Sequence, residues 1–483
     1  MPRSSYALVM ALAMLATSTQ QALAAVNTYN AEKLENNFLM FRKNAMYAMS
    51  DAPYVIASEN ARSVIEISLK FNVPPELAAD PNTLVQVSAF PAEDYKYLGI
   101  NVEDAGSSAE GSPGERLYCC SESMAAEGAV CTVPHSLIFS PGAHDVVSWD
   151  VMPDGEGEAR LFRTYTIEKK GFYYLVINFC NPTSSEIEVT GETRWVNPYG
   201  FLPAEVYGFL GFYFYMSIAY VVASMVWTYL CGRHWRELHQ LQNCISVVLA
   251  FGLLESFLRY YDFYHFNLYG TRSKFFMFTG LFFLCVKKTV SRMLVLVVAM
   301  GFGVLRPSLG ENANKIAALG GAHFLLSYLH LVITQLNHSR ALTFGGFLLE
   351  VPVVAVDFII FMWSFSSLAV IIKSLGARRQ ETKLDLYVSF RRILVAAVVV
   401  GCAWSVFFAY CIRTNYVDLH WQDFYKLEAF WDVLYFAVLL AIIYLWAPSA
   451  SSQRYAYDKV DGFDPRDEEY ATGLEDVKKP NED

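Results

Sequence analysis

The sequence predicts a membrane protein in which an all-β sandwich precedes a bundle of seven transmembrane helices. Hydrophobic residues make up 54% of the 483 residues and charged residues only 17%, against about 25% charged in typical soluble domains. Short β-rich runs alternate with turn residues between 26 and 197, and long apolar segments follow. A helix needs about 20 apolar residues to cross a bilayer, so the second part predicts membrane spans.

Residues 1–25 have the features of a secretory signal peptide. Arg3 precedes an apolar run from 7 to 16, and Ala22-Leu23-Ala24 fits the small-x-small cleavage pattern. The alternative is an uncleaved membrane anchor. We expect removal, which places the following segment in an oxidising compartment.

The segment 26–197 is expected to form a lumenal β-sandwich. Its strand signals include Ser63–Phe71, Leu84–Phe90, Val146–Val151 and Gly171–Phe179, and the last is the strongest because it is rich in aromatic and β-branched residues. Translocation makes disulfide candidates of Cys119, Cys120, Cys131 and Cys180, with three possible pairings.

Seven spans are predicted within 198–447, namely 204–231, 238–259, 273–305, 316–336, 350–374, 392–412 and 426–446. The third is the difficult one, because Lys287, Lys288 and Arg292 lie in its middle and could mark a loop. The apolar pieces on either side, 275–286 and 293–304, are each well short of about 20 residues. One long helix of about 50 Å is therefore predicted.

The distribution of Lys and Arg predicts a lumenal N-terminus and a cytosolic C-terminus. With seven spans, the cluster between 373 and 392 falls on the cytosolic side. The tail 448–483 holds ten acidic and five basic residues and is expected to be disordered. Within it, Tyr457 and Val460 fit a tyrosine-x-x-hydrophobic sorting motif, a pattern that is also common by chance. Asn337 begins a glycosylation sequon beside a membrane boundary.

Three motifs of the membrane half resemble those of the GOLD-domain seven-transmembrane (GOST) family, also called lung seven-transmembrane receptor-like. The first is the junction Gly200–Tyr207 at the start of the first span. The second combines Lys288–Leu294 with Gly301–Gly310, and the third combines Leu445–Ser449 with Gln453–Tyr457. Ala447 departs from the pattern, because a basic residue is expected before the proline.

The resemblance implies a GOLD-like sandwich on a seven-helix bundle, located in Golgi or endosomal membranes. It also implies a role in membrane trafficking through membrane-protein cargo or trafficking machinery, and a bundle cavity that holds a phospholipid. A signalling receptor and an ion-conducting protein remain alternatives. Against the receptor, the third span ends in Leu305-Arg306-Pro307 rather than an Asp-Arg-Tyr-type motif.

The sequence shows no catalytic or metal-binding pattern. It lacks a P-loop, a Gly-x-Ser-x-Gly motif and a His-Glu-x-x-His motif, and no further ligand accompanies His135 and His144. We therefore expect a protein that is not an enzyme and uses no cofactor. The net charge of −10 argues against nucleic acid as a partner.

Charged residues inside predicted spans are costly and usually face a bundle interior or water. We hypothesise that Lys287, Lys288 and Arg292 point inward and that Lys288 and Arg292 contact an anionic or zwitterionic headgroup. Asp357 is the expected protein partner, and Glu255 is the second available carboxylate, so the interior is expected to carry net positive charge. The alternative is structural ion pairing or snorkelling.

Other polar residues of the spans have simpler interpretations. His323 and His330 are interpreted as core histidines bonded to a neighbouring helix. Glu428 and Asp432 are expected near the lumenal mouth of the last span, in contact with solvent. Cys411 is expected at the lumenal end of the sixth span. We hypothesise that it bonds to Cys119, Cys120 or Cys131.

Overall fold

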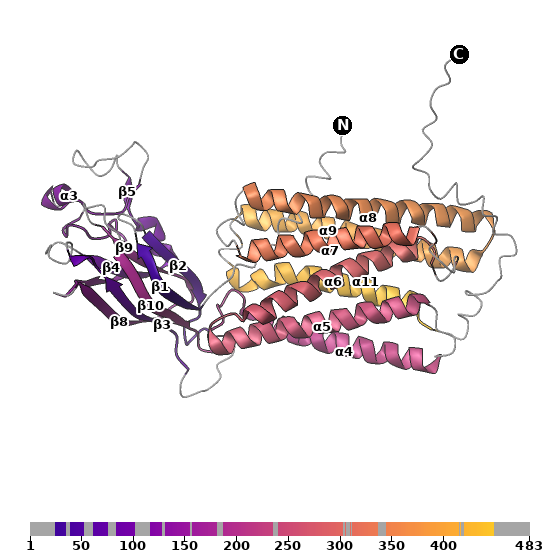
Figure 1. Ribbon diagram of the computed structural model, residues 1–483, viewed down its shortest axis with the longest axis horizontal. Helices are drawn as coiled ribbons and strands as arrows, with labels where there is room; N and C mark the ends of the chain where they lie inside the picture. Colours follow the sequence, from indigo (N-terminus) through magenta and orange to yellow (C-terminus); the bar gives the residue numbers. More distant parts are fainter. Residues whose placement is uncertain are drawn as a thin grey trace, which may run out of the picture. The chain divides into compact units, whose positions relative to one another are not determined.

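The computed structural model describes residues 25–448 apart from short gaps (Figure 1). The gaps are 35–38, 53–60, 76–83, 102–115, 128–130, 155–156, 181–186, 235–239, 303–304, 306–309, 311, 337–343, 415 and 417–419. The predicted signal peptide up to residue 24, Asn337, Tyr457 and Val460 lie outside the described residues.

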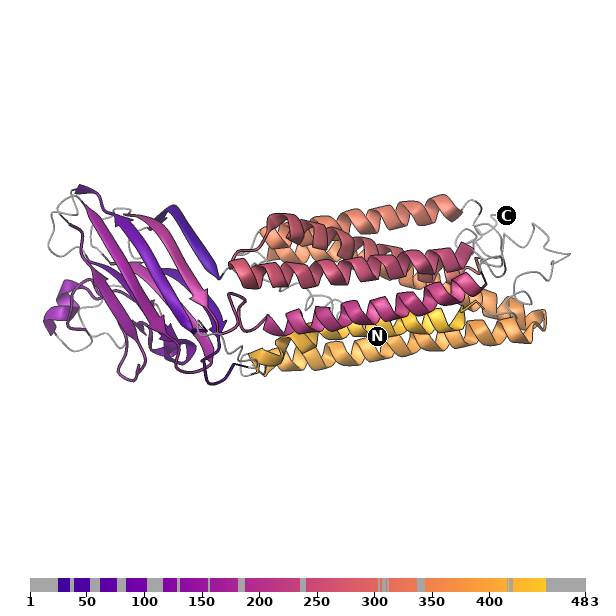
Figure 2. The same ribbon diagram turned by 90° about the horizontal axis from the view of Figure 1, so that it is seen from below.

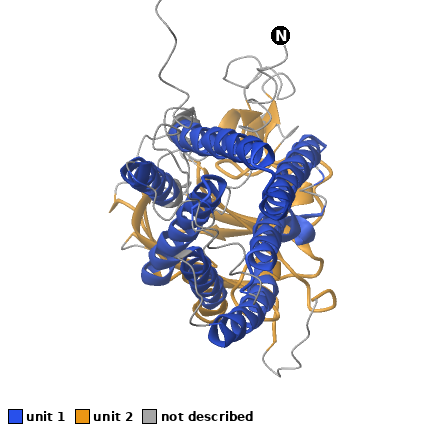
Figure 3. Cartoon of the chain, turned by 90° about the vertical axis from the view of Figure 1, so that its right-hand side faces the viewer, with its two compact units in different colours: residues 1–22, 209–262, 274–483 blue, residues 23–208, 263–273 orange. Residues whose placement is uncertain are grey.

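The chain forms two compact units, coloured separately in Figure 3. One comprises Leu23–Gly208 with Phe263–Ser273, and the other contains Phe209–Asp262 and Lys274–Asp483. The first unit holds the strands and the second holds most of the helical bundle. Residues 263–269 are the last part of a helix that begins in the second unit.

The β unit consists of two four-stranded sheets and a small two-stranded one (Figures 1 and 2). One sheet has the order β1-β10-β3-β8, the other β2-β9-β4-β7, and β5 pairs with β6. The strands are β1 Val26–Leu34, β2 Leu39–Met46, β3 Val64–Asn72, β4 Val85–Pro91, β5 Ile100–Asn101, β6 Arg116–Leu117, β7 Val147–Val151, β8 Glu158–Thr166, β9 Gly171–Phe179 and β10 Ile187–Val196. The predicted all-β sandwich is confirmed.

Alternation along the strands explains how the sheets bury their side chains. In β3, Ile65, Ile67, Leu69 and Phe71 are all at most 2% exposed, while the intervening polar residues are more accessible. Side chains of successive strand residues point to opposite faces, so this pattern turns one apolar face inward. Gly191 of β10 has φ +124° and lies against Ser68 O of β3, where a Cβ atom would overlap.

Two disulfides hold the connections between the strands. Cys119 pairs with Cys180 and Cys120 pairs with Cys131, which resolves the pairing that the sequence left open. The first bond joins the end of β9 to a segment 61 residues earlier, and the second closes a short loop around α3 (Glu122–Glu127). The 3₁₀ helix η1 (Ala92–Tyr97) follows β4 directly.

Seven long helices make up the rest of the described chain (Figures 1 and 2). They are α4 Tyr207–Arg233, α5 Gln240–Tyr269, α6 Lys274–Ala299, α7 Asn312–Leu336, α8 Phe344–Ala377, α9 Glu381–Arg413 and α11 Phe424–Leu445, which the 3₁₀ helix η4 (Trp421–Asp423) precedes. Six of the seven are long and apolar enough to cross a membrane. The exception is α6, because Lys287, Lys288 and Arg292 interrupt its apolar sequence.

The prediction of one helix across the charged third segment is confirmed, although the helix is shorter than expected. It ends at Ala299 rather than 305, because Gly301 adopts φ +80°. Phe302 N donates to Val297 O and Gly301 N donates to Val298 O, the hydrogen bonds of a Schellman cap. At 1.5 Å per residue the helix is about 39 Å long, not 50 Å.

Helices α5 and α9 extend well beyond their predicted spans. α5 continues ten residues past 259, and α9 begins at Glu381 rather than 392. Hydropathy identifies the apolar centre of a helix, whereas its ends depend on local capping and packing. Asn267 near the end of α5 illustrates this, because it donates to Tyr199 O at 2.9 Å and accepts from Leu202 N at 3.1 Å within the β unit.

Candidate functional site

A cavity of about 490 Å³ lies inside the helical bundle. All seven long helices contribute to its wall, from Phe209 of α4 to Ile442 of α11. About half of the lining residues are Leu, Val, Ile or Phe, and the polar ones come mainly from α6, α7, α8 and α11. A mostly apolar cavity with a few polar groups is the usual form of a site for a small organic ligand.

Helix α6 supplies three cations to this cavity. Buried residues recur every three to four positions along one face of this helix. Gly280, Leu284, Lys287, Leu294 and Val298 are all buried along this face. Lys287 therefore occupies a core position of an otherwise apolar stripe. The neighbouring Lys288 and Arg292, one turn apart, lie on the adjoining face and line the cavity.

Lys287 is held by two carboxylates from other helices. Its Nζ lies 2.9 Å from Glu255 Oε2 of α5 and 3.1 Å from Asp432 Oδ1 of α11. Tyr213 of α4 donates to Asp432 Oδ2 at 3.1 Å, and Arg259 Nε lies 3.3 Å from Glu255 Oε1. The Lys287 and Glu255 side chains are at most 3% exposed. This cluster links α4, α5, α6 and α11 within the bundle.

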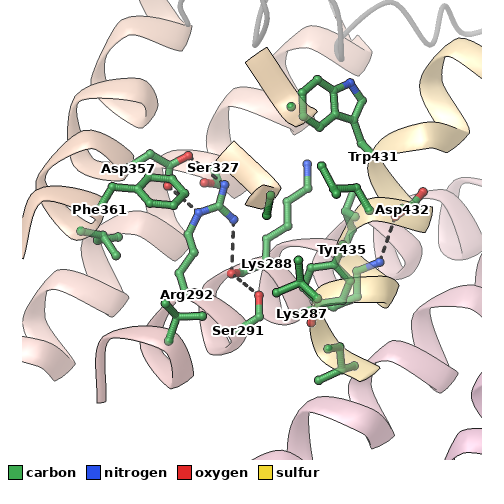
Figure 4. Close-up of a pocket in the computed structure, with 18 of the residues that line it drawn as sticks. Lys287, Lys288, Ser291, Arg292, Ser327, Asp357, Phe361, Trp431, Asp432 and Tyr435 are labelled. Carbon is green, nitrogen blue, oxygen red and sulfur yellow. Dashed lines mark hydrogen bonds and ion pairs between the residues drawn. The ribbon is translucent and has the colours of Figure 1, made fainter. Parts of the chain in front are cut away.

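Arg292 forms a second cluster on the opposite side of Lys288 (Figure 4). Its Nη2 donates to Asp357 Oδ2 of α8 at 2.8 Å, and its Nε lies 2.6 Å from Oδ1. His323 Nε2 of α7 lies 3.0 Å from Asp357 Oδ1, and His323 Nδ1 lies 2.7 Å from Thr289 Oγ1. Asp357 thus lies between Arg292 and His323, and Thr289 lies within hydrogen-bond distance of the other ring nitrogen of His323.

Lys288 differs from both neighbouring cations, because it has no ion pair or hydrogen bond from its ammonium to any described residue. Figure 4 shows its side chain between the Arg292–Asp357 pair and the Lys287–Asp432 pair. Glu428 also lines the cavity, and its Oε1 is buried without a hydrogen-bond partner among described atoms. Among the described residues, the cavity thus presents one cation and one carboxylate without hydrogen-bond or ion-pair partners.

The structure corrects the expected charge balance of the interior. The prediction counted Asp357 and Glu255 against three cations, and it placed Asp432 in solvent. Asp432 instead pairs with Lys287, and its side chain is only 22% exposed. With Arg259 and Glu428 included, the described cluster holds four cations and four carboxylates. The net positive charge that we expected is therefore absent.

Some of the other predicted contacts of the cavity residues are present and others are not. The pairing of Arg292 with Asp357 is present, and His323 is bonded to neighbouring helices as expected. His330 lines the cavity, but its Nδ1 has no hydrogen-bond partner among the described atoms. Glu255 does not line the cavity itself and acts through Lys287.

The expected disulfide of Cys411 is wrong. Its thiol is free and 1% exposed. The physical reason is that the four ectodomain cysteines Cys119, Cys120, Cys131 and Cys180 already pair with one another, so none of them is available to Cys411.

Sequence reasoning missed Tyr213, Arg259, Thr289 and Ser327. Tyr213 and Arg259 bind the carboxylates of the first cluster, and Thr289 orients His323. The role of Arg259 could have been predicted from the sequence. It follows Glu255 by four residues, and oppositely charged residues at that spacing on a helix form ion pairs. The hydroxyl residues carried no such signal, since Thr and Ser are common in membrane helices.

The sequence of the helical half matches a known membrane family. The family described as "GOST, seven transmembrane domain" matches residues 209–453, just over half of the chain. The chain belongs to the GOST seven-transmembrane family. It is therefore a multi-pass membrane protein with a β-sandwich before its helical bundle.

Several curated proteins are similar to this GOST protein. "Transmembrane protein 87B" of Mus musculus is 26% identical over 312 residues, which covers 64% of this chain and 56% of the relative. "Transmembrane protein 87A" of Homo sapiens is 28% identical over 289 residues, covering 60% and 51%. "Membrane protein PTM1" of Saccharomyces cerevisiae is 24% identical over 396 residues, covering 78% and 73%. The matched region thus spans little more than half the length of the first two relatives.

Proposed function

We propose that this GOST protein is a non-enzymatic component of Golgi and endosomal membranes that binds a phospholipid in its bundle cavity and supports membrane-protein trafficking. The observation that carries the lipid part is Lys288, a cavity-lining cation without an acidic partner in the described chain. Charged groups at membrane depth mark functional sites when their charge is not used in the fold.

The chemistry of the cavity favours a headgroup with both charges. Lys288 supplies a donor for a phosphate oxygen, and Arg292 lies one turn away with its guanidinium on Asp357. Glu428 offers a carboxylate oxygen without a hydrogen-bond partner among described atoms, which suits an ammonium group. The apolar remainder of the wall suits acyl chains. A zwitterionic phospholipid satisfies all three features with one molecule.

Co-purifying lipid tests this part of the proposal. The full-length protein is purified in mild detergent, and extracted phospholipid per mole of protein is measured by mass spectrometry. Lys288→Ala/Arg292→Ala should lose the bound phospholipid, whereas Lys426→Ala should keep it, because Lys426 is an exposed residue paired with Asp423. An undiminished lipid content in the double variant would mean that these side chains have a structural role only.

The trafficking part rests on the family and on the tail motif at Tyr457 and Val460. We expect the tail to face the cytosol, where an adaptor can read it. Proximity labelling from the tail, combined with imaging against organelle markers, should identify coat and cargo proteins on Golgi and endosomal membranes. G-protein neighbours at the cell surface would instead indicate a receptor.

Ion conduction is a second candidate, favoured by the charged groups that line the cavity. However, the Lys287 and Arg292 clusters hold most of these charges in ion pairs that connect four helices. Such pairing is what a structural role requires. Reconstitution with current recording separates the two functions. Currents that Lys288→Ala alters, with an unchanged lipid content, would favour conduction.

A further inference from the structure

One end of the bundle carries a strongly basic helical hairpin. It consists of residues 373–392, which include the end of α8 and the start of α9, and we call it the basic hairpin. It contains six Lys or Arg residues against Glu381 and Asp385, a formal charge of +4. Within the described chain, no salt bridge forms to five of the six cations, namely Lys373, Arg379, Lys383, Arg391 and Arg392.

Lys383 is the unusual member of this group. It is only 5% exposed, although the other four are exposed. It is the third residue of α9, where the positive end of the helix dipole disfavours a cation. Its ammonium is not among the buried atoms without a hydrogen-bond partner, so burial affects mainly the aliphatic stem, and the charge adds to that of the exposed cations of the hairpin.

Tyr387 lies one turn further along the same helix face. It is fully buried and its hydroxyl has no hydrogen-bond partner among the described atoms, so this hydroxyl is closed to a docking segment. The hairpin therefore offers its exposed cations to an anionic partner.

The C-terminal tail begins beside this surface. Trp446, at the end of α11, packs edge-on against Phe390 of α9 with 5.1 Å between ring centroids. The 35 residues that follow Pro448 have a net charge of −5, and residues 458–476 alone contain eight acidic and two basic residues. Residue 458 is ten residues beyond Pro448, a reach of up to about 33 Å. Lys383 lies about 10 Å along α9 from Phe390.

We propose that the acidic segment 458–476 binds the basic hairpin of its own chain, with its carboxylates paired with the exposed cations Lys373, Arg379, Arg391 and Arg392. Tethering raises the effective concentration of the segment to about the millimolar range, so individually weak contacts suffice. The segment starts next to Tyr457 and includes Val460. The bound tail therefore hides the sorting motif, a consequence that rests on the proposed function, whereas the contact itself does not.

Trypsin cleavage after Lys459 tests the contact on the full-length protein in nanodiscs of phosphatidylcholine. The rate is divided by the rate for the denatured protein, so that local sequence effects cancel. We expect at least about fivefold protection of the wild-type tail at low salt because tethering keeps the site occupied. Protection should disappear in about 1 M salt, where the Debye length is about 3 Å.

Two variants remove the opposite halves of the contact. The hairpin variant combines exposed positions that leave the fold intact: Lys373→Gln, Arg379→Gln, Arg391→Gln and Arg392→Gln. The tail variant leaves the residues around Lys459 unchanged and combines Asp467→Asn, Glu468→Gln, Glu469→Gln, Glu475→Gln and Asp476→Asn. Both should be cleaved at the unprotected rate at low salt. The matched control, Arg233→Gln/Lys315→Gln, removes two exposed cations from α4 and α7 and should be protected like wild type.

Three results would overturn the proposal. Equal cleavage of the wild type and both variants would show that the tail does not bind. Faster cleavage of the control as well would reduce the effect to overall charge. Loss of binding to anionic lipid nanodiscs by the hairpin variant, with unchanged cleavage of its tail, would assign the basic hairpin to lipid headgroups instead.

Discussion

Asp357 joins three helices, and its loss should destabilise the bundle more than the loss of any exposed acid. Its side chain is 3% exposed and contacts Arg292 of α6 and His323 of α7 from its position on α8. Asp357→Asn keeps the shape but leaves the guanidinium without a counter-charge. Removing one partner of a buried pair costs about 3–5 kcal/mol. Because the Arg292 side chain is 26% exposed, we expect a loss near the lower limit, about 3 kcal/mol.

The assay is thermal unfolding of the full-length protein in detergent, with a double-mutant cycle between Asp357→Asn and Arg292→Met. The double variant should be less destabilised than the sum of the two single changes, because no charge is left unpaired. Asp423→Asn at the exposed Asp423–Lys426 pair is the matched control and should cost about 1 kcal/mol or less. The reasoning fails if Asp357→Asn unfolds at the wild-type temperature or if the double variant shows simple additivity.

Three further predictions concern other parts of the chain. Burial raises the pKa of Glu205 to about 7 despite the attraction of Lys43. Because the folded pKa exceeds the unfolded one, ionisation of Glu205 opposes folding increasingly from about pH 4.5 to 7. Glu205→Gln should therefore raise the melting temperature at pH 8 but not at pH 4, and an equal gain at both would contradict this. Cys119→Ser/Cys180→Ser should destabilise the β unit by about 2–5 kcal/mol, measured by urea denaturation; an unchanged midpoint would refute it. Tyr457→Ala should shift the protein toward the cell surface at unchanged abundance, and an unaltered distribution in imaging would remove the motif.

The sequence predicted the architecture because the relevant signals are local. Alternating apolar residues marked β3, β4, β7 and β9, and long apolar stretches marked the seven helices. The apolar pieces on either side of the α6 charges are each too short to span a bilayer, and this was sufficient to predict one helix there. Helix ends were less predictable. The turn at Gly301 shortens α6, the contacts of Asn267 accompany the longer α5, and the first turns of α9 carry the buried Tyr387 and Phe390.

The pairing of charges could not be read from the sequence. Lys287 and Asp432 are 145 positions apart, and several carboxylates were equally available in composition. Only packing decides that Asp432 faces α6 rather than solvent. The same limitation applied to the cysteines, because the sequence allowed three pairings and gave no sign that Cys411 would be left free.

The most direct test of the lipid-binding cavity is native mass spectrometry of the full-length protein, compared with Lys288→Gln. Among the described α6 cations that line the cavity, the substitution removes the one without an acidic partner, and it preserves both neighbouring ion-pair clusters. The wild type should carry one phospholipid that survives detergent removal, and Lys288→Gln should appear without it at an unchanged melting temperature. A lipid-free wild type, or a variant that retains the same phospholipid at the same occupancy, would contradict the account.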